Sequence, residues 1–352
     1  MSNQTVDHYS AETGRFYNPR KATAPRLSLR ESLSLLFKLG FDTASRLPAG
    51  KLPDIQPDMT AFLAPADHLK FIWFGHSTLL LNLEGKIMLI DPVFSATVSP
   101  FSFMFQRFQP AAITLDELPK VDIILISHDH YDHLDEKTIR FFLNQETAFI
   151  VPLKVGKYLQ KWGIERSRIQ EFDWYDTLRY GNLTFTATPA RHFSGRSPFA
   201  HNKTLWVSWV IQSQSERIFF SGDSSYGTHF KDIGERFGPF DLAFMENGQY
   251  DRRWPDAHMM PENTIQAVQD IQANVFVPIH WGMFTLSFHH WSEPVIRTSQ
   301  LASERQLTML TPRLGEIATK HLSPVSPAWW ERVQHVDGIL EAAVPSQETQ
   351  VE

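Results

Sequence analysis

Apolar and polar positions divide the chain into a long central part and two different ends. Between residues 67 and 335, short apolar runs typical of buried β-strands recur, such as Lys70–Phe74, Leu79–Leu83 and Val275–Ile279. Polar turns such as Glu84–Gly85 join the early runs, whereas helical patterns separate several of the later ones. This mixture predicts one α/β domain in which two sheets are packed between helices.

The N-terminal end, residues 1–66, is rich in polar residues and proline, and we interpret it as an extension. Ser28 and Glu31 have the spacing of a capping box, which predicts that a helix begins there and ends near Gly40. We expect this amphipathic helix to pack on the domain, with a membrane surface or a partner protein as the alternative. Residues 336–352 form a polar tail that we expect to be disordered. The apolar face of the predicted helix comprises Leu29, Leu33, Leu36 and Phe37.

Composition narrows the class of protein. The 352 residues are 42% hydrophobic and 20% charged, which is enough apolar material for a sizeable core. The net charge of −6 provides no basic surface for nucleic acid, and we expect no nucleic-acid partner. Because there is no cysteine, a metal would have to be held by histidine and carboxylate groups. The sequence contains neither a signal peptide nor a bilayer-spanning run, so we expect a cytoplasmic protein, with peripheral membrane contact left open.

The segment VDIILISHDHYDHLD, residues 121–135, carries the strongest functional signal. An apolar strand runs directly into a loop that contains three histidines and two aspartates, and Asp135 can cap a following helix. Imidazole and carboxylate groups suit zinc and similar metals. Alternate residues can converge on one ion, while Asp132 and His133 turn toward a second ion. Packing does not readily explain such a cluster at a strand end, so the sequence predicts a metal centre there.

Three later strands end in the same way. Apolar runs lead to His192, to Asp223 and to His280, and ligands gather beyond the carboxyl ends of strands because loops meet there. Each residue alone is a weak signal. Together with the HDHYDH loop, they complete two coordination shells.

At this point the sequence resembles a known family. The HDHYDH loop, the SGDS aspartate and the IHWG histidine are similar to the metallo-β-lactamase superfamily. The strings FIWFGHSTLLL, LIDPVFS, FFSGDSSY and PIHWGMF resemble its N-acyl-phosphatidylethanolamine-hydrolysing phospholipase D branch. The resemblance covers roughly residues 67–315 and a short GRFYNP piece near the N-terminus. It implies an αββα four-layer sandwich with the site at one edge.

The resemblance also implies a set of ligands. His128, His130 and His192 would bind the first metal, and Asp132, His133 and His280 would bind the second. The remaining predicted ligand, which would bridge the two metals, is Asp223.

The activity implied is that of a dinuclear zinc-dependent hydrolase. Its substrate would be a phosphodiester in a phospholipid such as N-acyl-phosphatidylethanolamine, attacked by a metal-bound hydroxide that Asp132 orients. The cofactor would be two Zn²⁺, with iron or manganese not excluded by the sequence. Two alternatives stay open: a hydrolase of a small ester, lactone or cyclic phosphate, and a non-catalytic metal-binding scaffold. The oligomeric state also stays open, a homodimer included.

Residues around the predicted ligands have expected roles and plainer alternatives. Asp91 would support the metal loop, unless it is an ordinary turn residue, and His76 would do the same, unless it is a satisfied buried histidine. His258 matches a histidine near the substrate and would protonate the leaving group, with a surface loop position as the alternative. Glu246 departs from the family pattern, which usually has an apolar or small residue there.

Phenylalanines are crowded into the segment SPFSFMFQRF, residues 99–108. We expect Phe101, Phe103 and Phe105 to line an acyl-chain groove or to touch a membrane. The alternative is that they pack under the N-terminal extension.

Overall fold

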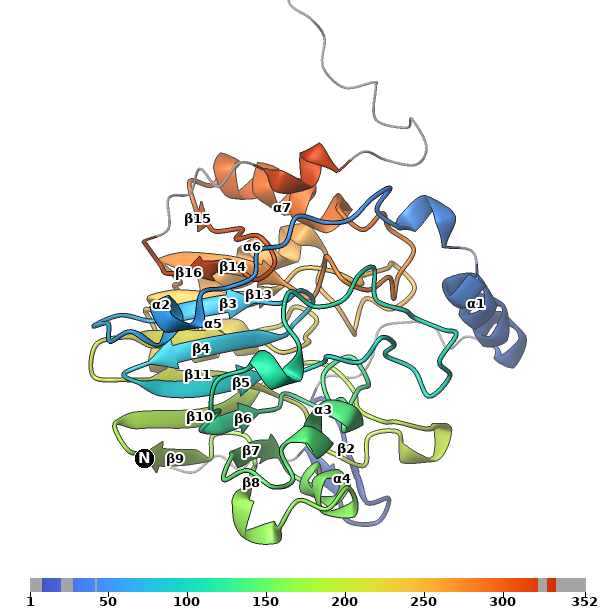
Figure 1. Cartoon of the computed structure of the whole chain (residues 1–352). Helices are drawn as coiled ribbons and strands as arrows, with labels where there is room; N and C mark the ends of the chain where they lie inside the picture. Colours follow the sequence, from blue (N-terminus) through green and yellow to red (C-terminus); the bar gives the residue numbers. More distant parts are fainter. Residues whose placement is uncertain (1–7, 20–27, 42, 322–327, 334–352) are drawn as a thin grey trace, which may run out of the picture.

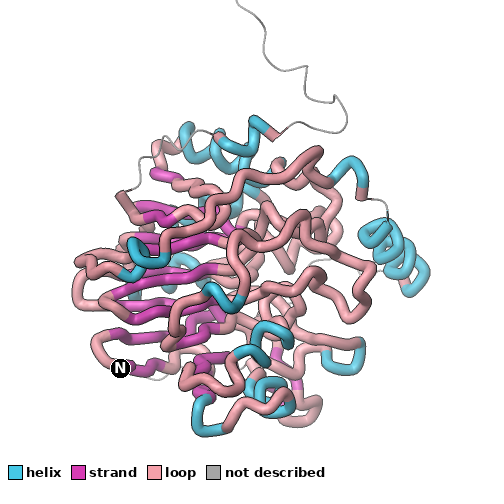
Figure 2. Tube along the Cα trace, viewed as in Figure 1, coloured by secondary structure: helices cyan, strands magenta, loops and turns pink. Residues whose placement is uncertain are grey.

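Two seven-stranded sheets are stacked face to face and covered by helices on both sides (Figures 1 and 2). The computed structural model describes residues 8–19, 28–41, 43–321 and 328–333. The predicted tail, residues 336–352, lies outside this described part. The layers are helices, sheet, sheet and helices, so the predicted αββα sandwich is confirmed.

The first sheet is antiparallel at one end and parallel at the other. Neighbouring strands from β16 to β5 are antiparallel, and those from β5 to β8 are parallel. Its strands, in spatial order, are β16 (Ile317–Ala318), β3 (Lys70–Trp73), β4 (Leu79–Leu83), β5 (Lys86–Ile90), β6 (Ile123–Leu125), β7 (Ala148–Pro152) and β8 (Ile169–Phe172).

The second sheet has the same division. Neighbouring strands from β12 to β15 are parallel, and those from β9 to β12 are antiparallel, so β10 runs in the same direction as β12. Its strands, in spatial order, are β15 (Thr308–Met309), β14 (Val275–Ile279), β13 (Leu242–Glu246), β12 (Arg217–Phe220), β11 (Val207–Gln212), β10 (Leu183–Pro189) and β9 (Thr177–Tyr180).

Side-chain alternation explains why the strands read as continuous apolar runs. Phe71 and Trp73 of β3 join the core between the sheets, whereas Ile72 joins the core between the first sheet and its helices. Since both faces of each sheet are covered, apolar residues are needed at successive positions. The helices over the first sheet are α2 (Met59–Leu63), α3 (Glu136–Phe141) and α4 (Gly156–Lys161), and those over the second are α5 (His229–Phe237), α6 (Pro261–Asp270) and α7 (Glu293–Glu304).

Short 3-10 turns occur in the connections. They are η1 (Ala44–Arg46), η2 (Leu115–Glu117), η3 (Arg166–Arg168), η4 (Pro198–Ala200) and η5 (Trp329–Arg332). None of the helices in the described ranges has both the length and the apolar character needed to cross a bilayer.

The described part of the N-terminal extension consists of a hairpin and a helix. The hairpin strands are β1 (Tyr9–Ser10) and β2 (Arg15–Phe16), and Phe16 is buried in the core between the sheets. Helix α1 (Leu29–Phe41) forms the predicted capping box and runs one residue past Gly40.

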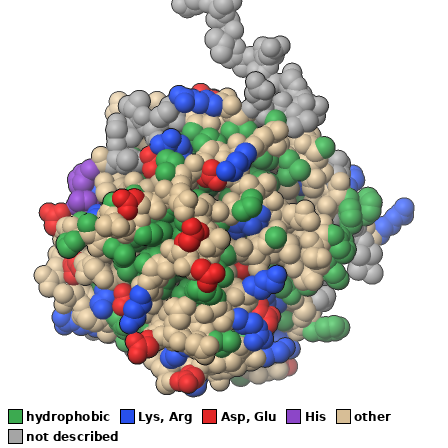
Figure 3. All heavy atoms as spheres, viewed as in Figure 1, with side chains coloured by type: hydrophobic (Ala, Val, Ile, Leu, Met, Phe, Trp, Pro, Cys, Tyr) green, Lys and Arg blue, Asp and Glu red, His purple; other side chains and the backbone are tan. Residues whose placement is uncertain are grey.

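Helix α1 differs from its prediction in one respect. Phe37, expected on the packed face, is 65% exposed, and Phe41 is 55% exposed. Hydrophobic side chains are visible at the edge of the molecule where α1 lies (Figure 3). The expected packing of Phe37 on the domain is therefore wrong, because the helix projects from the body instead of lying along it.

Candidate metal centre

The predicted ligands meet where strands of both sheets end. The HDHYDH loop follows β6 of the first sheet, while His192, Asp223 and His280 follow β10, β12 and β14 of the second. Because β10, β12 and β14 run in the same direction, their carboxyl ends share one edge. The structure thus brings all seven predicted ligand residues together, in buried or half-buried positions: His128, His130, Asp132, His133, His192, Asp223 and His280.

One group of side chains, called the first cluster below, comprises His128, His130, His192 and Asp223. Nδ1 of His130 is 2.9 Å from Nε2 of His128 and 3.2 Å from Nε2 of His192. Oδ2 of Asp223 is 3.7 Å from Nε2 of both His128 and His192. Burial lowers the pKa of His130 to about 4 and also lowers those of His128 and His192. The neutral imidazole, which is the form that ligates metals, is therefore favoured here.

The second cluster comprises His76, Asp132, His133 and His280. Nε2 of His133 is 3.4 Å from Asp132 Oδ2 and 3.1 Å from Asp223 Oδ2, and Nδ1 of His280 is 3.1 Å from Asp223 Oδ1. Asp223 therefore contacts histidines of both clusters. Although burial alone would raise the pKa of Asp132, His133 and His76 hold it well below its usual range.

Buried atoms without hydrogen bonds test whether these residues fit a metal. Among the described residues, His133 Nε2, His280 Nε2 and Asp223 Oδ1 are buried and have no hydrogen-bond partner. An unsatisfied buried polar atom costs about 1–3 kcal/mol, so such atoms seldom cluster without a reason. Divalent cations bound at the two clusters would supply partners for such atoms. The donor set of imidazoles and carboxylates fits zinc, iron or manganese.

Asp91 lies directly behind the metal loop. Its carboxylate accepts hydrogen bonds from His133 Nδ1 at 2.7 Å and from the Ser127 backbone N–H at 2.7 Å, and it is fully buried. Since Nδ1 of His133 is engaged, Nε2 is the nitrogen turned toward the cluster. This is the contact expected of a residue that orients a ligand rather than of an ordinary turn residue.

His76, predicted to support the metal loop, is itself a member of the second cluster. Its Nε2 is 2.8 Å from Asp132 Oδ2, and its ring is 4.1 Å from the ring of His280. Both His76 and His280 have positive φ angles, 52° and 67°, and hydrogen bonds join His280 N to His76 O and His76 N to Trp281 O. Left-handed backbone is uncommon for such residues and tends to occur at functional sites.

His258 is placed at the centre rather than on the surface. Its ring is 5.2 Å from that of His192 and 5.1 Å from that of His280, and its Nδ1 is hydrogen-bonded to Glu246. In the sequence analysis, Glu246 was noted only because it departs from the family pattern. Glu246 is fully buried and was not predicted as a site residue, because its contact with His258 depends on how the following loop folds back.

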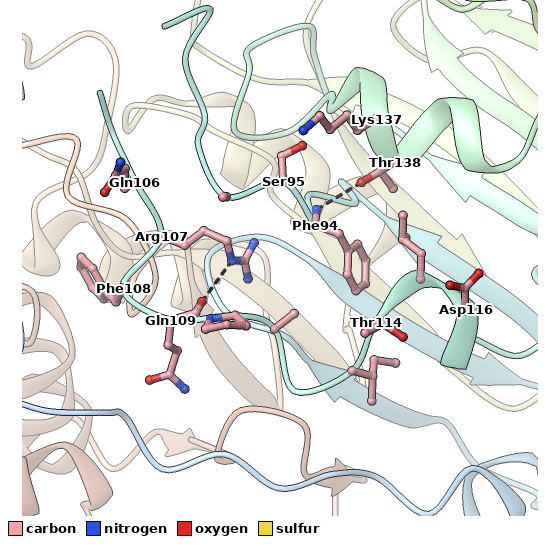
Figure 4. Close-up of a pocket in the computed structure, with 15 residues that line it drawn as sticks. Phe94, Ser95, Gln106, Arg107, Phe108, Gln109, Thr114, Asp116, Lys137 and Thr138 are labelled. Carbon is pink, nitrogen blue, oxygen red and sulfur yellow. Dashed lines mark hydrogen bonds between the residues drawn. The ribbon is translucent and has the colours of Figure 1, made fainter. Parts of the chain in front are cut away.

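The three phenylalanines predicted to line a groove do not lie together around one cavity. Phe101 and Phe103 are 56% and 60% exposed, and the Phe103 ring is 6.2 Å from that of Phe41 in α1. Phe105 is half-buried against the core between the sheets. A separate cavity of about 740 Å³, which the sequence did not indicate, lies nearby and is lined by none of these three (Figure 4). Its lining includes Phe94, Arg107, Phe108, Ile113, Leu115 and Lys137.

The family follows from the comparison with known domains. Residues 87–281 match the model of the β-lactamase superfamily domain, which is more than half of the chain. The matched range contains all seven predicted ligands. The chain belongs to this superfamily and is a metal-dependent hydrolase.

Individual proteins resemble this chain in sequence or in fold. An uncharacterized protein of Mycobacterium tuberculosis is 38% identical over 326 residues, covering 90% of this chain and 86% of the relative. N-acyl-phosphatidylethanolamine-hydrolyzing phospholipase D 1 of Caenorhabditis elegans is 32% identical over 263 residues, covering 70% and 74%. Among solved structures, the metallo hydrolase Igni18 of Ignicoccus hospitalis has a TM-score of 0.56 at 20% identity, covering 71% of this chain and 97% of that one. The last likeness bears on the fold alone.

Proposed function

We propose that this protein is a dinuclear zinc hydrolase that cleaves a phosphodiester in a phospholipid such as N-acyl-phosphatidylethanolamine. The observation that carries the proposal is that Asp223 contacts histidines of both clusters, at 3.1 Å and 3.7 Å. A shared carboxylate suits two adjacent ions better than one. The similarity to the phospholipase D of Caenorhabditis elegans supports the substrate class.

We assign the ligands to the two ions in the same way as the sequence analysis did. When bound, two ions would supply an activated water and neutralise charge on the phosphate. Their holders would be His128, His130 and His192 for the first, Asp132, His133 and His280 for the second, and Asp223 for both.

Side chains next to the proposed ions would orient the water and transfer the proton. Asp132, held by His76, orients the attacking water. His258 faces the leaving-group side and passes a proton to the leaving oxygen as the P–O bond breaks. The water that adds to phosphorus returns a proton to the ring, so protons balance over the cycle.

The exposed phenylalanines are assigned to lipid contact. Phe37, Phe41, Phe101 and Phe103 are all more than half exposed, and their rings form a chain of contacts between α1 and the loop after β5. Such a group on the surface suits peripheral contact with a membrane that holds the substrate.

The experiment combines metal content with lipid hydrolysis. Zinc-loaded protein should contain two metal ions per chain and should release phosphatidic acid from N-acyl-phosphatidylethanolamine in mixed micelles. Asp132→Asn should abolish release, while the matched control His321→Ala, at an exposed histidine, should not. Loaded protein that binds metal but leaves the lipid intact would contradict the proposal.

Additional substrates separate the remaining candidates. Hydrolysis of a lactone or of bis-p-nitrophenyl phosphate without lipid turnover would favour a small-molecule hydrolase. A protein that binds metal and hydrolyses none of these would favour a scaffold.

A further inference from the structure

Glu246 is a carboxylate in an unusual position. It is the last residue of β13, between β12 and β14, whose ends carry Asp223 and His280, and it is fully buried. Taking a carboxylate out of water costs several kcal/mol unless neighbouring groups compensate for it. Burial accordingly raises the pKa of Glu246 well above its usual range. A residue that is retained at such a cost calls for a specific role.

Both oxygens of Glu246 already take part in hydrogen bonds. Oε1 is bonded to His258 Nδ1, and Oε2 accepts from the backbone N–H of Ser224 at 3.0 Å. Glu246 lies close enough to Asp223 and His280 to join a metal site. Two atoms of the predicted ligands, His133 Nε2 and Asp223 Oδ1, have no hydrogen-bond partner within the described residues, whereas both oxygens of Glu246 have one. The contrast argues that Glu246 orients a neighbour rather than binding a metal.

The neighbour that Glu246 orients is His258. The ring of His258 is 5.2 Å from that of His192 in the first cluster and 5.1 Å from that of His280 in the second. An imidazole has two nitrogens, and a carboxylate that accepts a hydrogen bond from Nδ1 fixes both the proton on that atom and the direction of Nε2.

We propose that Glu246 is a positioning residue that accepts a hydrogen bond from Nδ1–H of His258, so that Nε2 faces the leaving oxygen of the substrate. When the ring acts as the acid it carries a second proton, on Nε2, and this is the proton that passes to the leaving oxygen. This inference rests on the proposed function for the identity of the reacting bond. The His258–Glu246 contact itself does not depend on that function, and the two can fail separately.

The first test compares leaving groups. Two lipids would share the phosphatidyl group and differ in the leaving alcohol, N-acylethanolamine in one and p-nitrophenol in the other. A poor leaving group needs a proton, whereas p-nitrophenol departs largely without one. Glu246→Leu should lower kcat on the N-acylethanolamine lipid about 100-fold and on the p-nitrophenyl lipid less than about tenfold. Glu246→Gln, which keeps an acceptor oxygen, should recover part of the lost rate.

A matched control addresses structural damage. Thr264 Oγ1 donates to the backbone oxygen of Glu246 at 3.0 Å, so Thr264→Val disturbs the same strand end without touching the carboxylate. It should lower stability but leave the ratio of the two rates unchanged. Equal losses on both lipids in Glu246→Leu, or a changed ratio in Thr264→Val, would overturn the proposal.

Two further readouts are independent of turnover. The ¹⁵N spectrum of the histidine side chains should show a proton on Nδ1 of His258 in the zinc-loaded wild type and a mixture of tautomers in Glu246→Leu. Metal content should stay at the wild-type value in Glu246→Gln. A spectrum unchanged by Glu246→Leu, or loss of a metal ion in Glu246→Gln, would refute the positioning role even if the wild type cleaved neither lipid.

Discussion

The two clusters of the metal centre are held in different ways. In the first cluster, uncharged groups support the ligands: Ser127 Oγ is 2.9 Å from His128 Nδ1, and the backbone oxygen of Ala257 is 2.9 Å from His192 Nδ1. In the second cluster, two contacts join a histidine to a carboxylate: His133 Nδ1 to Asp91 at 2.7 Å, and His76 Nε2 to Asp132 at 2.8 Å. His280 Nδ1, by contrast, is 3.1 Å from the Ser77 hydroxyl oxygen. The second ion should therefore depend more on Asp91, a carboxylate outside its own ligand set.

The largest effect is expected where the clusters meet. Asp223→Ala removes the carboxylate that contacts both, and with it several kcal/mol of interaction with the ions, so kcat should fall about 10³-fold or more. Metal analysis should find fewer than two ions per chain. Asp122→Asn, at a part-buried aspartate that bonds the backbone of Ile87, is the matched control. A variant that kept both ions and most of its rate would remove Asp223 from the centre.

Removal of both ions should lower thermal stability. Without a cation, the buried atoms of the clusters that have no hydrogen-bond partner stay unsatisfied. At zinc concentrations about 1,000 times the dissociation constant, binding stabilises by about 4 kcal/mol, which corresponds to roughly 5–10 °C in Tm. Thermal unfolding with and without chelator measures this. Equal Tm values, together with metal analysis that confirms removal, would contradict it.

Substitution of Asp91 distinguishes the clusters. Asp91→Ala frees His133 to turn, so affinity for one of the two ions should fall about 10–100-fold while the other is less affected. Titration of the metal-free protein with zinc, followed by calorimetry, should then show two separated binding steps. Equal weakening of both steps would mean that the clusters do not differ in their support.

The smallest effect concerns the exposed phenylalanines. Phe101→Ser combined with Phe103→Ser changes side chains that are more than half exposed, so the free energy of unfolding should move by less than about 1 kcal/mol. Binding to phospholipid vesicles should weaken about tenfold or more, because each phenylalanine would otherwise bury apolar surface. Sedimentation with vesicles measures this. Unchanged binding with a clear loss of stability would favour a packing role.

Features formed by residues close together in the sequence could be predicted, whereas contacts between a loop and a distant strand end could not. The HDHYDH loop is readable because its ligands lie within six residues after an apolar strand. His192, Asp223 and His280 are separated in the sequence, and only the rule that ligands gather at strand ends joined them. The layered fold could be predicted from the apolar runs, because a sheet that is covered on both faces needs apolar residues at successive positions.

Other features depend on tertiary structure. The contact of His258 with Glu246 arises because the loop after β13 returns over the strand end, and no periodic pattern encodes that path. Phe37 fits an apolar helical face whether α1 packs on the domain or projects from it, so its 65% exposure could not be predicted. The cavity beside Arg107 is formed by loops that have no regular pattern.

The most direct test of the central claim is anomalous X-ray scattering from crystals of the zinc-loaded protein. We predict two zinc peaks in each chain. One should be bound by His128, His130 and His192, the other by Asp132, His133 and His280, with Asp223 touching both. A single peak, or a second ion bound away from Asp223, would contradict the account.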